Sequence, residues 1–352
     1  MYVIDSANVN EALAVGVRIF LNGGEEIAPR GSRTLEWFEP VTTLYRRPWE
    51  RVLLNATRDA NPFFHFMEGL WMLAGRDDAA WIGQFNSTFI QFSDNGKTFH
   101  GAYGHRMRSL INTDRDQVET AIDMLKTDPD TRRVVIQLWN SVHDLGRDGK
   151  DVPCNTQIYL KIRNRKLNML VTCRSNDMIL GAYGANAVHF SMIHEYIAGR
   201  IGVPMGEYRQ MSDSFHVYVD NPVWKRLVDC PPGYYDPYVS EPYWSGPHLV
   251  PMFPAYDRST HNKFDTDLGY FMRVTEQEEG VGLERSEVLL MSAGFHTPFF
   301  NWVAAPMYRV WSLYKRDMLK EALKATGSIQ AVDWKVACAN WVERRIDRRA
   351  QT

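Results

Sequence analysis

Cysteine is scarce in this sequence, and its distribution argues against a disulfide framework. The four cysteines lie far apart, and no two of them form a CxxC pair; they are Cys154, Cys173, Cys230 and Cys338. Small secreted domains that depend on disulfides carry denser, paired cysteines. We therefore expect a reduced, cytosolic protein.

Long apolar runs are also missing. No stretch reaches the roughly 18 apolar residues that a membrane-spanning helix needs, so we expect no such helix. Residues 1–24 carry acids and lack a basic segment ahead of an apolar block, which argues against a signal peptide. The expected location is the cytoplasm, or the host cytoplasm if the protein is viral.

A surplus of charge is absent as well. The 40 basic and 42 acidic residues leave a net charge of −2. A domain that binds duplex nucleic acid usually carries a basic surplus. Neither nucleic acid nor a membrane is therefore an expected partner, although clustered arginines can still bind a single phosphate.

Hydrophobic residues, in contrast, make up 45% of the 352 residues, enough for a large core. Their patterns predict an α+β fold with a catalytic domain to about residue 220 and a mostly helical extension after it. Expected helices are 61–74, 116–126, 187–200, 284–295, 307–323 and 334–348. Expected strands are 34–45, 132–139, 157–162, 167–174 and 207–219, with a hairpin turn at Asn164–Arg165. Residues 9–22 read as a helix running into a strand, and residues 222–256 as a surface loop.

Cys154 is the first candidate for chemistry. Most lone cysteines are buried small hydrophobes. Cys154, however, follows Pro153 after the polar stretch Gly146–Asp151, with arginines in the same region. A guanidinium near a thiol lowers its pKa toward neutrality and favours the nucleophilic thiolate, so we expect Cys154 to act as a nucleophile.

Several cations and one hydroxyl could hold an anion. The candidates are Arg30, Arg132, Arg133, Arg174 and Ser175. A single surface arginine is usually just solvated. Arg174, however, ends an apolar alternating strand, where an unpaired charge would be costly. A bound phosphate would pair it, because guanidinium groups match phosphate oxygens.

Four further polar residues have both structural and functional interpretations. Glu68, in an almost wholly apolar helix, would be a buried ion pair or a proton relay whose pKa is raised by desolvation. Asn186 would cap the next helix or read a base edge. His216 and Tyr218, two apart on a strand, share a face and would either pack or bind a sugar hydroxyl.

Other sites are disfavoured. His189 and His194 are five residues apart, a poor spacing for two metal ligands on one helix face, so no metal is expected. Gly181-Ala182-Tyr183-Gly184 lacks the lysine of a P-loop and the GxGxxG of a dinucleotide fold. The local signature of a papain-like Cys/His pair is absent too.

Taken together, these residues resemble the thymidylate synthase superfamily, which includes the pyrimidine-nucleotide hydroxymethylases. The matching residues are Arg132-Arg133, Pro153-Cys154, Arg174-Ser175-Asn176-Asp177, Asn186 and His216-Val217-Tyr218, together with Glu68 and Tyr103. The resemblance runs from about Pro29 to Tyr218. It implies a mixed β-sheet domain flanked by helices over residues 1–220, with residues 221–352 packed on it.

The resemblance implies that Cys154 attacks C6 of a pyrimidine nucleoside 5′-monophosphate, and that C5 takes a one-carbon unit from 5,10-methylenetetrahydrofolate. Phosphate binding falls to Arg30, Arg174 and Ser175, and to Arg132 and Arg133 from the second subunit of a homodimer. Base reading falls to Asn186, contacts with the 3′-hydroxyl to His216 and Tyr218, proton transfer to Glu68 and Tyr103, and pterin binding to Asp177.

Departures from the synthase pattern favour a different product. Asn155 stands where many synthases carry His, Cys173 stands where Gln is usual, and Asn176 gives the RSND form that resembles the hydroxymethylases. Residues 182–186 are one residue longer than the synthase motif. Phe89-Ile90-Gln91-Phe92 occupies the region of a synthase tryptophan.

The C-terminal sequence RRAQT is unlike the apolar tail that closes over folate in synthases. Without closure, water would capture the exocyclic methylene intermediate and leave a hydroxymethyl group. An Asn at 186 favours uracil, whereas the cytosine-specific members carry Asp there. We therefore expect dUMP hydroxymethylation, as in viral pathways that replace or hypermodify thymine. The alternatives are thymidylate synthesis, hydroxymethylation of dCMP or CMP, and a non-catalytic nucleotide-binding protein.

Overall fold

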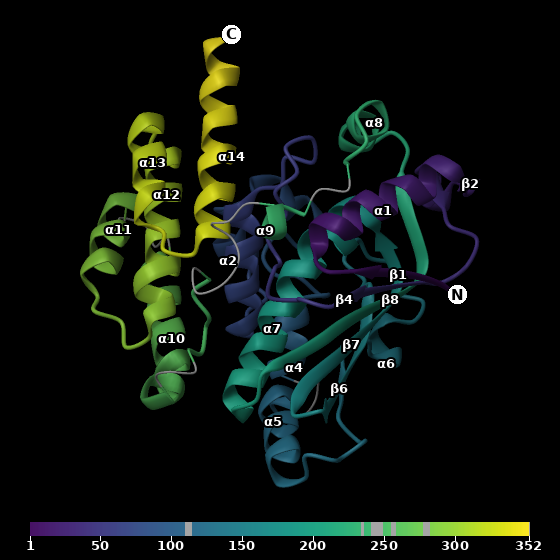
Figure 1. The fold of residues 1–352 in the computed structure, drawn as a ribbon, viewed down its shortest axis with the longest axis horizontal. Coiled ribbons are helices and arrows are strands. Elements are labelled where there is room, and N and C mark those ends of the chain that lie inside the picture. The colour runs from purple at the N-terminus through teal and green to yellow at the C-terminus, as the bar shows by residue number, and fades with distance from the viewer. Residues whose placement is uncertain (110–114, 234–235, 241–248, 255–257, 277–281, 352) are drawn as a thin grey trace.

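The computed structural model of the chain describes residues 1–109, 115–233, 236–240, 249–254, 258–276 and 282–351. Within these residues the chain forms a mixed sheet of eight strands with helices packed against it, and a group of helices stands beyond them (Figure 1). The expected α+β class with a mixed sheet is confirmed. No helix among the described residues is long and apolar enough to cross a bilayer.

The sheet brings together segments that are far apart in sequence. Its strands are β1 (Tyr2–Ser6), β2 (Glu25–Ile27), β3 (Thr34–Glu36), β4 (Val41–Tyr45), β5 (Val135–Gln137), β6 (Asn155–Arg163), β7 (Lys166–Asp177) and β8 (Met205–Tyr218). The order is β1-β4-β8-β7-β6-β5, and β2 joins through β3, which also pairs with β8. The β1–β4 and β7–β8 pairs are parallel and the others antiparallel. The ends of β6, β7 and β8 therefore place Cys154, Arg174 and His216 on neighbouring strands.

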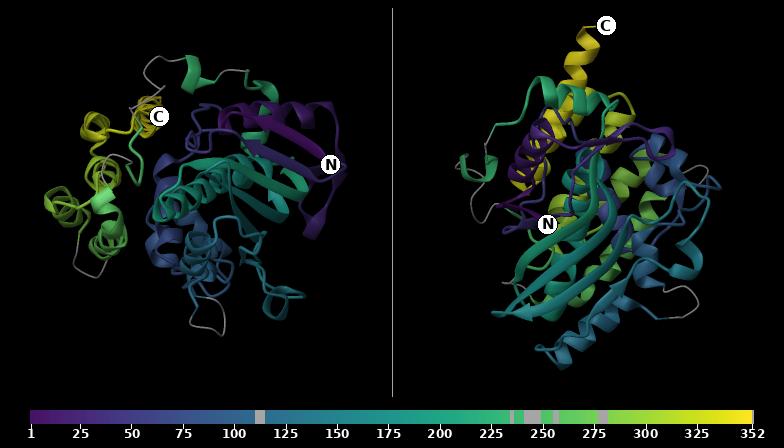
Figure 2. Two further views of the ribbon diagram at one scale, coloured as in Figure 1. Left: turned by 60° about the horizontal axis from the view of Figure 1, so that its bottom comes forward. Right: turned by 90° about the vertical axis from the view of Figure 1, so that its right-hand side faces the viewer.

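Helices α2 and α7 lie between the sheet and the C-terminal helices (Figures 1 and 2). The helices are α1 (Val9–Asn22), α2 (Pro62–Leu73), α3 (Ala79–Gly83), α4 (Tyr103–Arg108), α5 (Gln117–Thr127), α6 (Ser141–Asp144), α7 (Asn186–Ile201), α8 (Pro222–Asp229), α9 (Pro237–Ser240), α10 (Phe264–Thr275), α11 (Leu283–Ser292), α12 (Ala305–Lys315), α13 (Leu319–Ala325) and α14 (Val332–Ala350).

Helix α2 is buried on every face, as its apolar composition predicts. Asn61 starts it by accepting a hydrogen bond from the Phe64 backbone amide at 3.1 Å, and Pro62 occupies the first turn. On the far side from the sheet, the Phe66 ring lies 5.7 Å from Phe299 and 5.1 Å from Trp334. The extension thus completes the core around α2.

Two predicted strands need correction. Residues 9–22 form the single helix α1, because Asn8 caps it and its apolar residues cover one helical face. The predicted strand 34–45 divides into β3 and β4, with Pro40, which lacks a ladder N–H, between them. The predicted hairpin is confirmed: β6 and β7 pair around Asn164 and Arg165, both at positive φ (52° and 61°).

The predictions for the extension are partly wrong. Residues 222–256 include the helix α8, and residues 234–235, 241–248 and 255–257 lie outside the described residues. Helix α10 had no counterpart in the prediction. The predicted helix 307–323 is divided between α12 and α13 around Asp317, which has a φ of 67°. The boundary at residue 220 stays a prediction.

Candidate active site

Cys154 and Arg174 lie side by side at the start of β6 and the end of β7. The Arg174 backbone amide donates to the Cys154 carbonyl at 2.9 Å. The guanidinium donates to the carbonyls of Pro153 and Val152, both at 2.9 Å, and lies 3.9 Å from the Cys154 sulfur. The loop before Cys154 therefore fixes a cation against the sulfur.

The expected low pKa of Cys154 is wrong. Burial raises the pKa of the thiol, and the nearby guanidinium of Arg174 only partly opposes this shift. The carboxylate of Asp151 adds to the rise. Desolvation disfavours the thiolate more than one partly engaged guanidinium stabilises it. The thiol is therefore the resting form at neutral pH, and any attack by sulfur begins with loss of its proton.

Tyr103, at the start of α4, also contacts Cys154. Its hydroxyl oxygen accepts from the backbone amides of Cys154 at 3.2 Å and Asn155 at 3.3 Å. Burial raises the pKa of Tyr103 further above its ordinary value. The phenol therefore keeps its proton and can donate it toward a group held beside the sulfur.

A cavity of about 530 Å³ opens beside Arg174. It brings together five of the predicted site residues, which are Arg30, Arg174, Ser175, His216 and Tyr218. Arg30 has a left-handed φ of 51° within a tight turn, a conformation that costs energy in a non-glycine residue and is often found at functional sites. Two guanidinium groups and a serine hydroxyl in one cavity suit a phosphate dianion.

One wall of this cavity is built by pairing between β3 and β8. His216 is opposite Glu36 in the register, and its ring lies 5.5 Å from the Tyr218 ring. The Ser214 hydroxyl lies 3.3 Å from His216 Nδ1 and donates to the Glu36 carboxylate. This wall offers both hydrogen-bond donors and hydrogen-bond acceptors, which suits a sugar hydroxyl because a hydroxyl can donate and accept.

Asn186 lies at the start of α7 but does not cap it. Its side-chain nitrogen donates to Asn176 Oδ1 at 3.2 Å, and its oxygen accepts from Asn155 Nδ2 at 3.3 Å. The capping alternative is therefore wrong. The preceding segment, Met178–Ala185, is kinked at Tyr183 and Gly184, whose backbone dihedral angles are not helical.

Glu68 of α2 faces α7. Its Oε2 atom lies 3.1 Å from Nε2 of His189, and both side chains are buried. Neither atom has a well-oriented hydrogen bond within the part of the chain that the structure describes. The packing of α2 against α7 therefore keeps the carboxylate and the imidazole close together in the interior.

Asp177 carries an acceptor that the described residues leave unused. One carboxylate oxygen accepts from the Leu180 amide, whereas Oδ2 is buried and has no hydrogen-bond partner among the described residues. Burial raises the pKa of Asp177. A buried acceptor of this kind calls for a donor from a bound molecule, such as the N–H groups of a pterin.

Arg132 and Arg133 lie elsewhere. Both are exposed and line a hollow beside α5 with Thr120 and Asp123. Neither lines the cavity beside Arg174. Within one chain, then, the structure does not bring these two arginines to the other candidates.

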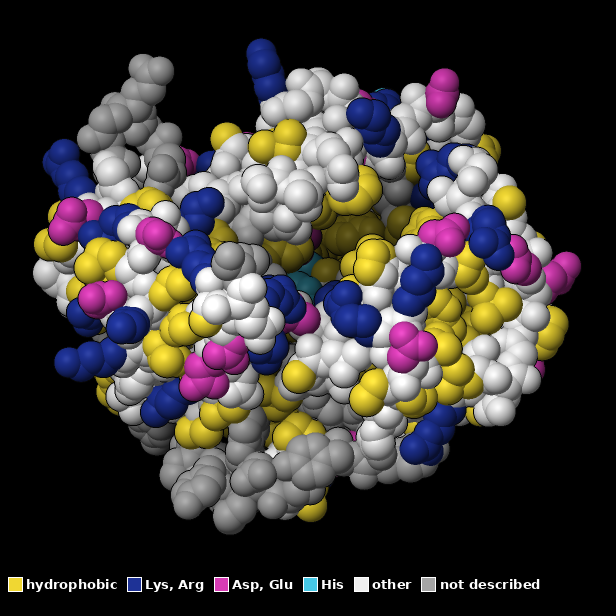
Figure 3. All heavy atoms as spheres, turned by 90° about the horizontal axis from the view of Figure 1, so that it is seen from above, with side chains coloured by type: hydrophobic (Ala, Val, Ile, Leu, Met, Phe, Trp, Pro, Cys, Tyr) yellow, Lys and Arg dark blue, Asp and Glu magenta, His cyan; other side chains and the backbone are white. Residues whose placement is uncertain are grey.

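The hollowed face seen in Figure 3 has a histidine at depth and Lys and Arg side chains around its opening.

Four residues near the candidate site were not predicted from the sequence as part of it: Glu36, Arg147, Ser214 and His189. Ser214 had a usable signal, because it precedes His216 by two residues and so shares its strand face. Arg147 lies in the polar loop before Cys154 and lines the same cavity. His189 was considered only as a metal ligand, although its position three after Asn186 places it on the same face of α7.

Comparison with known proteins gives consistent matches. The thymidylate synthase family profile matches residues 15–226. A deoxyuridylate hydroxymethyltransferase of Pseudomonas phage M6 is 39% identical over 98% of this chain and 95% of that protein. The deoxyuridylate hydroxymethyltransferase of Bacillus phage SP01 is 37% identical over 63% of this chain and 60% of its own. A putative thymidylate synthase of Methanosarcina acetivorans is 29% identical over 61% of this chain and 89% of its own.

Proposed function

This chain belongs to the thymidylate synthase family, and we propose that it is a deoxyuridylate hydroxymethyltransferase that converts dUMP to 5-hydroxymethyl-dUMP. The match at 39% identity over 98% of the chain carries this proposal. That match extends through the helical extension, whereas the family profile ends at residue 226. The extension is therefore shared with a hydroxymethyltransferase.

We propose that Cys154 forms the covalent bond. Its sulfur adds to C6 of the pyrimidine, and the electron pair of the ring double bond moves to C5, which then acts as the carbon nucleophile. Because the resting thiol is protonated, the Arg174 guanidinium at 3.9 Å serves to stabilise the thiolate as the proton leaves. Expulsion of the same sulfur later restores the ring double bond.

The cavity beside Arg174 holds the nucleotide in this proposal. Arg30, Arg174 and Ser175 bind the 5′-phosphate, and His216 with Tyr218 binds the 3′-hydroxyl. Fixing the phosphate places C6 over the sulfur and removes much of the entropic cost of the encounter. Arg147, which is paired with Asp94 at 2.9 Å, lines the same cavity.

Members of this family use methylenetetrahydrofolate, and the unpartnered Oδ2 of Asp177 fits a pterin donor. When bound, the folate supplies the one-carbon unit that becomes the hydroxymethyl carbon. Glu68, paired with His189, and Tyr103, beside Cys154, are the groups that we assign to proton transfer at the base and at C5. Water supplies the hydroxyl oxygen.

We also propose a homodimer formed through the open face of the sheet. Val135 and Tyr159 are exposed large side chains on the neighbouring strands β5 and β6, and they pair with each other in the register. Exposed apolar groups on adjacent strands are typical of an interface. A partner seated there would bring its Arg132 and Arg133 to the phosphate.

The products from a panel of nucleotides test the function. We expect dUMP with methylenetetrahydrofolate to give hydroxymethyl-dUMP and tetrahydrofolate, with dCMP and CMP turned over far more slowly. A rise in dihydrofolate absorbance would instead indicate reductive methylation. Faster turnover of dCMP would indicate a cytosine enzyme.

A further inference from the structure

Asn186 is one member of a row of buried polar side chains that crosses three strands and the start of α7. The row consists, in order, of Cys173, Asn155, Asn186, Asn176 and Ser212, each no more than 7% exposed. The outer contacts are 2.8 Å from Cys173 Sγ to Asn155 Oδ1 and 2.9 Å from Asn176 Nδ2 to Ser212 Oγ. The two inner hydrogen bonds run from Asn155 Nδ2 to Asn186 Oδ1 and from Asn186 Nδ2 to Asn176 Oδ1.

The row has a direction. An amide has a donor end and an acceptor end, so one amide in a chain of bonds fixes the orientation of the next. The Cys173 thiol is a donor and only a poor acceptor, which directs the oxygen of Asn155 toward it. The nitrogen of Asn155 must then face Asn186. The orientations of the Asn186 and Asn176 amides are therefore set from the Cys173 end of the row.

A rotation of the Asn186 amide that exchanges its nitrogen and oxygen, with the neighbouring side chains unchanged, would be energetically costly. Its nitrogen would face Asn155 Nδ2 and its oxygen would face Asn176 Oδ1, so two hydrogen bonds would become two contacts between like groups. Leaving a buried polar group without a hydrogen-bond partner lowers stability, because the group has lost its hydration without compensation. Gly181 packs against the row as well: a Cβ there would lie 2.6 Å from Asn176 Oδ1 and 3.3 Å from Asn186 Nδ2. The row is therefore closely enclosed.

One donor and one acceptor of Asn186 remain for a ligand after these bonds. Uracil presents O4 as an acceptor and N3–H as a donor, whereas cytosine presents an N4 donor and an N3 acceptor. An amide reads these two edges in opposite orientations. We propose that Cys173, Asn155 and Asn176 are positioning residues that hold Asn186 in the uracil-reading orientation, and so select dUMP against dCMP. This inference rests on the proposed function, because dUMP as substrate identifies which orientation is held.

Asn155→Asp is the sharpest test, because an ionised carboxylate accepts from both neighbours. The Cys173 thiol can still donate to it, but Asn186 must turn its nitrogen toward it. Asn176 then turns too, and the Ser212 hydroxyl can reverse to donate. We expect the kcat/KM ratio of dCMP to dUMP to rise on the order of tenfold or more. The rise should grow with pH, since only the ionised carboxylate reverses the row.

Cys173→Ala and Cys173→Ser form a matched pair should Asn155→Asp fail to fold. Alanine removes the donor that sets the direction, so discrimination against dCMP should weaken. Serine restores a donor and should restore discrimination. Cys230→Ser, at an exposed cysteine outside the row, is the control.

The outcomes separate this inference from the proposed function. If the wild-type enzyme forms no hydroxymethyl-dUMP, the proposed function fails, whatever the variants do. If it does, but folded Asn155→Asp keeps the wild-type base preference at every pH, the inference alone is overturned. Equal discrimination by Cys173→Ala and Cys173→Ser would overturn it as well.

Discussion

The sheet region, residues 1–218, and the C-terminal helices, residues 264–350, use their side chains in opposite ways. In the sheet region, polar groups converge on Cys154, which meets Arg174 and Tyr103 within a few ångströms. The helices instead contribute aromatic rings, such as Phe299 and Trp334 on Phe66. In the proposed function, the sheet region therefore carries the chemistry and the C-terminal helices support the core.

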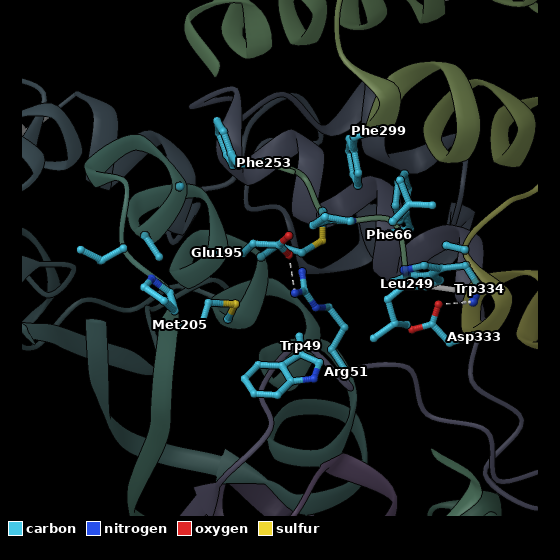
Figure 4. A pocket seen from close by; sticks show the side chains of 18 of the residues that line it. Trp49, Arg51, Phe66, Glu195, Met205, Leu249, Phe253, Phe299, Asp333 and Trp334 are labelled. Atoms are coloured by element: carbon cyan, nitrogen blue, oxygen red, sulfur yellow. Dashed lines mark hydrogen bonds and ion pairs between the residues drawn. The ribbon is translucent and has the colours of Figure 1, made fainter. Parts of the chain in front are cut away.

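The two parts meet around a cavity of about 460 Å³ between α7 and the extension (Figure 4). Phe253 and Phe299 point toward it from the extension side, and the buried ion pair of Arg51 and Glu195 lies across it. Asp333 lies at its edge and accepts a hydrogen bond from Tyr238 at 3.0 Å. The contact between the parts is therefore apolar, with a few buried charges.

A second contact joins α14 to the loop before α2. Three arginines of α14 bind the Asp59 carboxylate, which is only 10% exposed: Arg344 at 2.9 Å, Arg345 at 2.6 Å and Arg348 at 2.8 Å. The preceding residue, Arg58, donates to the Ile179 carbonyl at 3.0 Å, in the segment before Asn186. The extension is thus linked through two residues to the candidate base-reading segment.

The largest effect should come from the nucleophile. Cys154→Ser should lower turnover on the order of a thousandfold or more, because the hydroxyl is a far weaker nucleophile, while the melting temperature stays near the wild-type value. Release of tritium from 5-tritiated dUMP measures the loss. The exposed Cys230→Ser serves as the control. Tritium release that persists in Cys154→Ser would contradict the proposal that the Cys154 sulfur is required for the reaction.

An aromatic residue of the extension should instead affect stability. Trp334→Ala should lower the free energy of unfolding by about 3–5 kcal/mol, since it removes a ring packed on Phe66. Denaturant unfolding measures this, with the exposed Trp302→Ala as the control. A small stability change together with a large loss of turnover would mean that the extension takes part in the chemistry.

Asp59 tests the ionic link. Burial alone would raise the pKa of Asp59, but its bonds to Arg345, Arg344 and Arg348 outweigh burial and lower the pKa. Its stabilisation is therefore full above the unfolded-state pKa and is lost as pH falls through the lower folded-state value. Asp59→Asn should cost about 2 kcal/mol at neutral pH and less in acid. Asp317→Asn is the control: Asp59 and Asp317 both have a positive φ, and Asp317 is a surface partner of Arg349. This substitution should change the free energy of unfolding little.

Asp333 should show the opposite dependence on pH. Burial raises its pKa to about 6 from an ordinary value of 3.8. The folded state therefore favours the protonated form, and this carboxyl lowers stability as pH rises through that interval. Asp333→Asn should remove the dependence and gain about 3 kcal/mol above the interval, since one unit of pKa corresponds to about 1.4 kcal/mol. Melting temperatures of the two proteins, measured on either side of it, should converge in acid; a constant difference would contradict this account.

The sequence predicted the sheet region better than the extension for physical reasons. Buried and more exposed residues alternate along most of β7, and the turn residues Asn164 and Arg165 mark its hairpin with β6. The motif residues then meet because neighbouring strands end together. Helix α10 was missed, since part of its apolar face packs on distant residues: its Phe264 stacks on Phe253 and contacts Phe299.

Within the site, it was easier to predict which residues take part than how their surroundings shift their pKa values. Cys154 and Arg174 were expected as neighbours, yet the direction of the Cys154 pKa shift was not foreseen, because burial of one atom depends on the whole fold. The link between Glu68 and His189 was missed for a similar reason: its two residues come from helices whose packing no local pattern records.

The most direct test of the central claim is the mass of the nucleotide formed from dUMP and methylenetetrahydrofolate in water enriched in oxygen-18. The proposed water capture predicts a hydroxymethyl nucleotide that carries the heavy oxygen, and tetrahydrofolate as the other product. A methyl nucleotide without added oxygen, formed together with dihydrofolate, would contradict it.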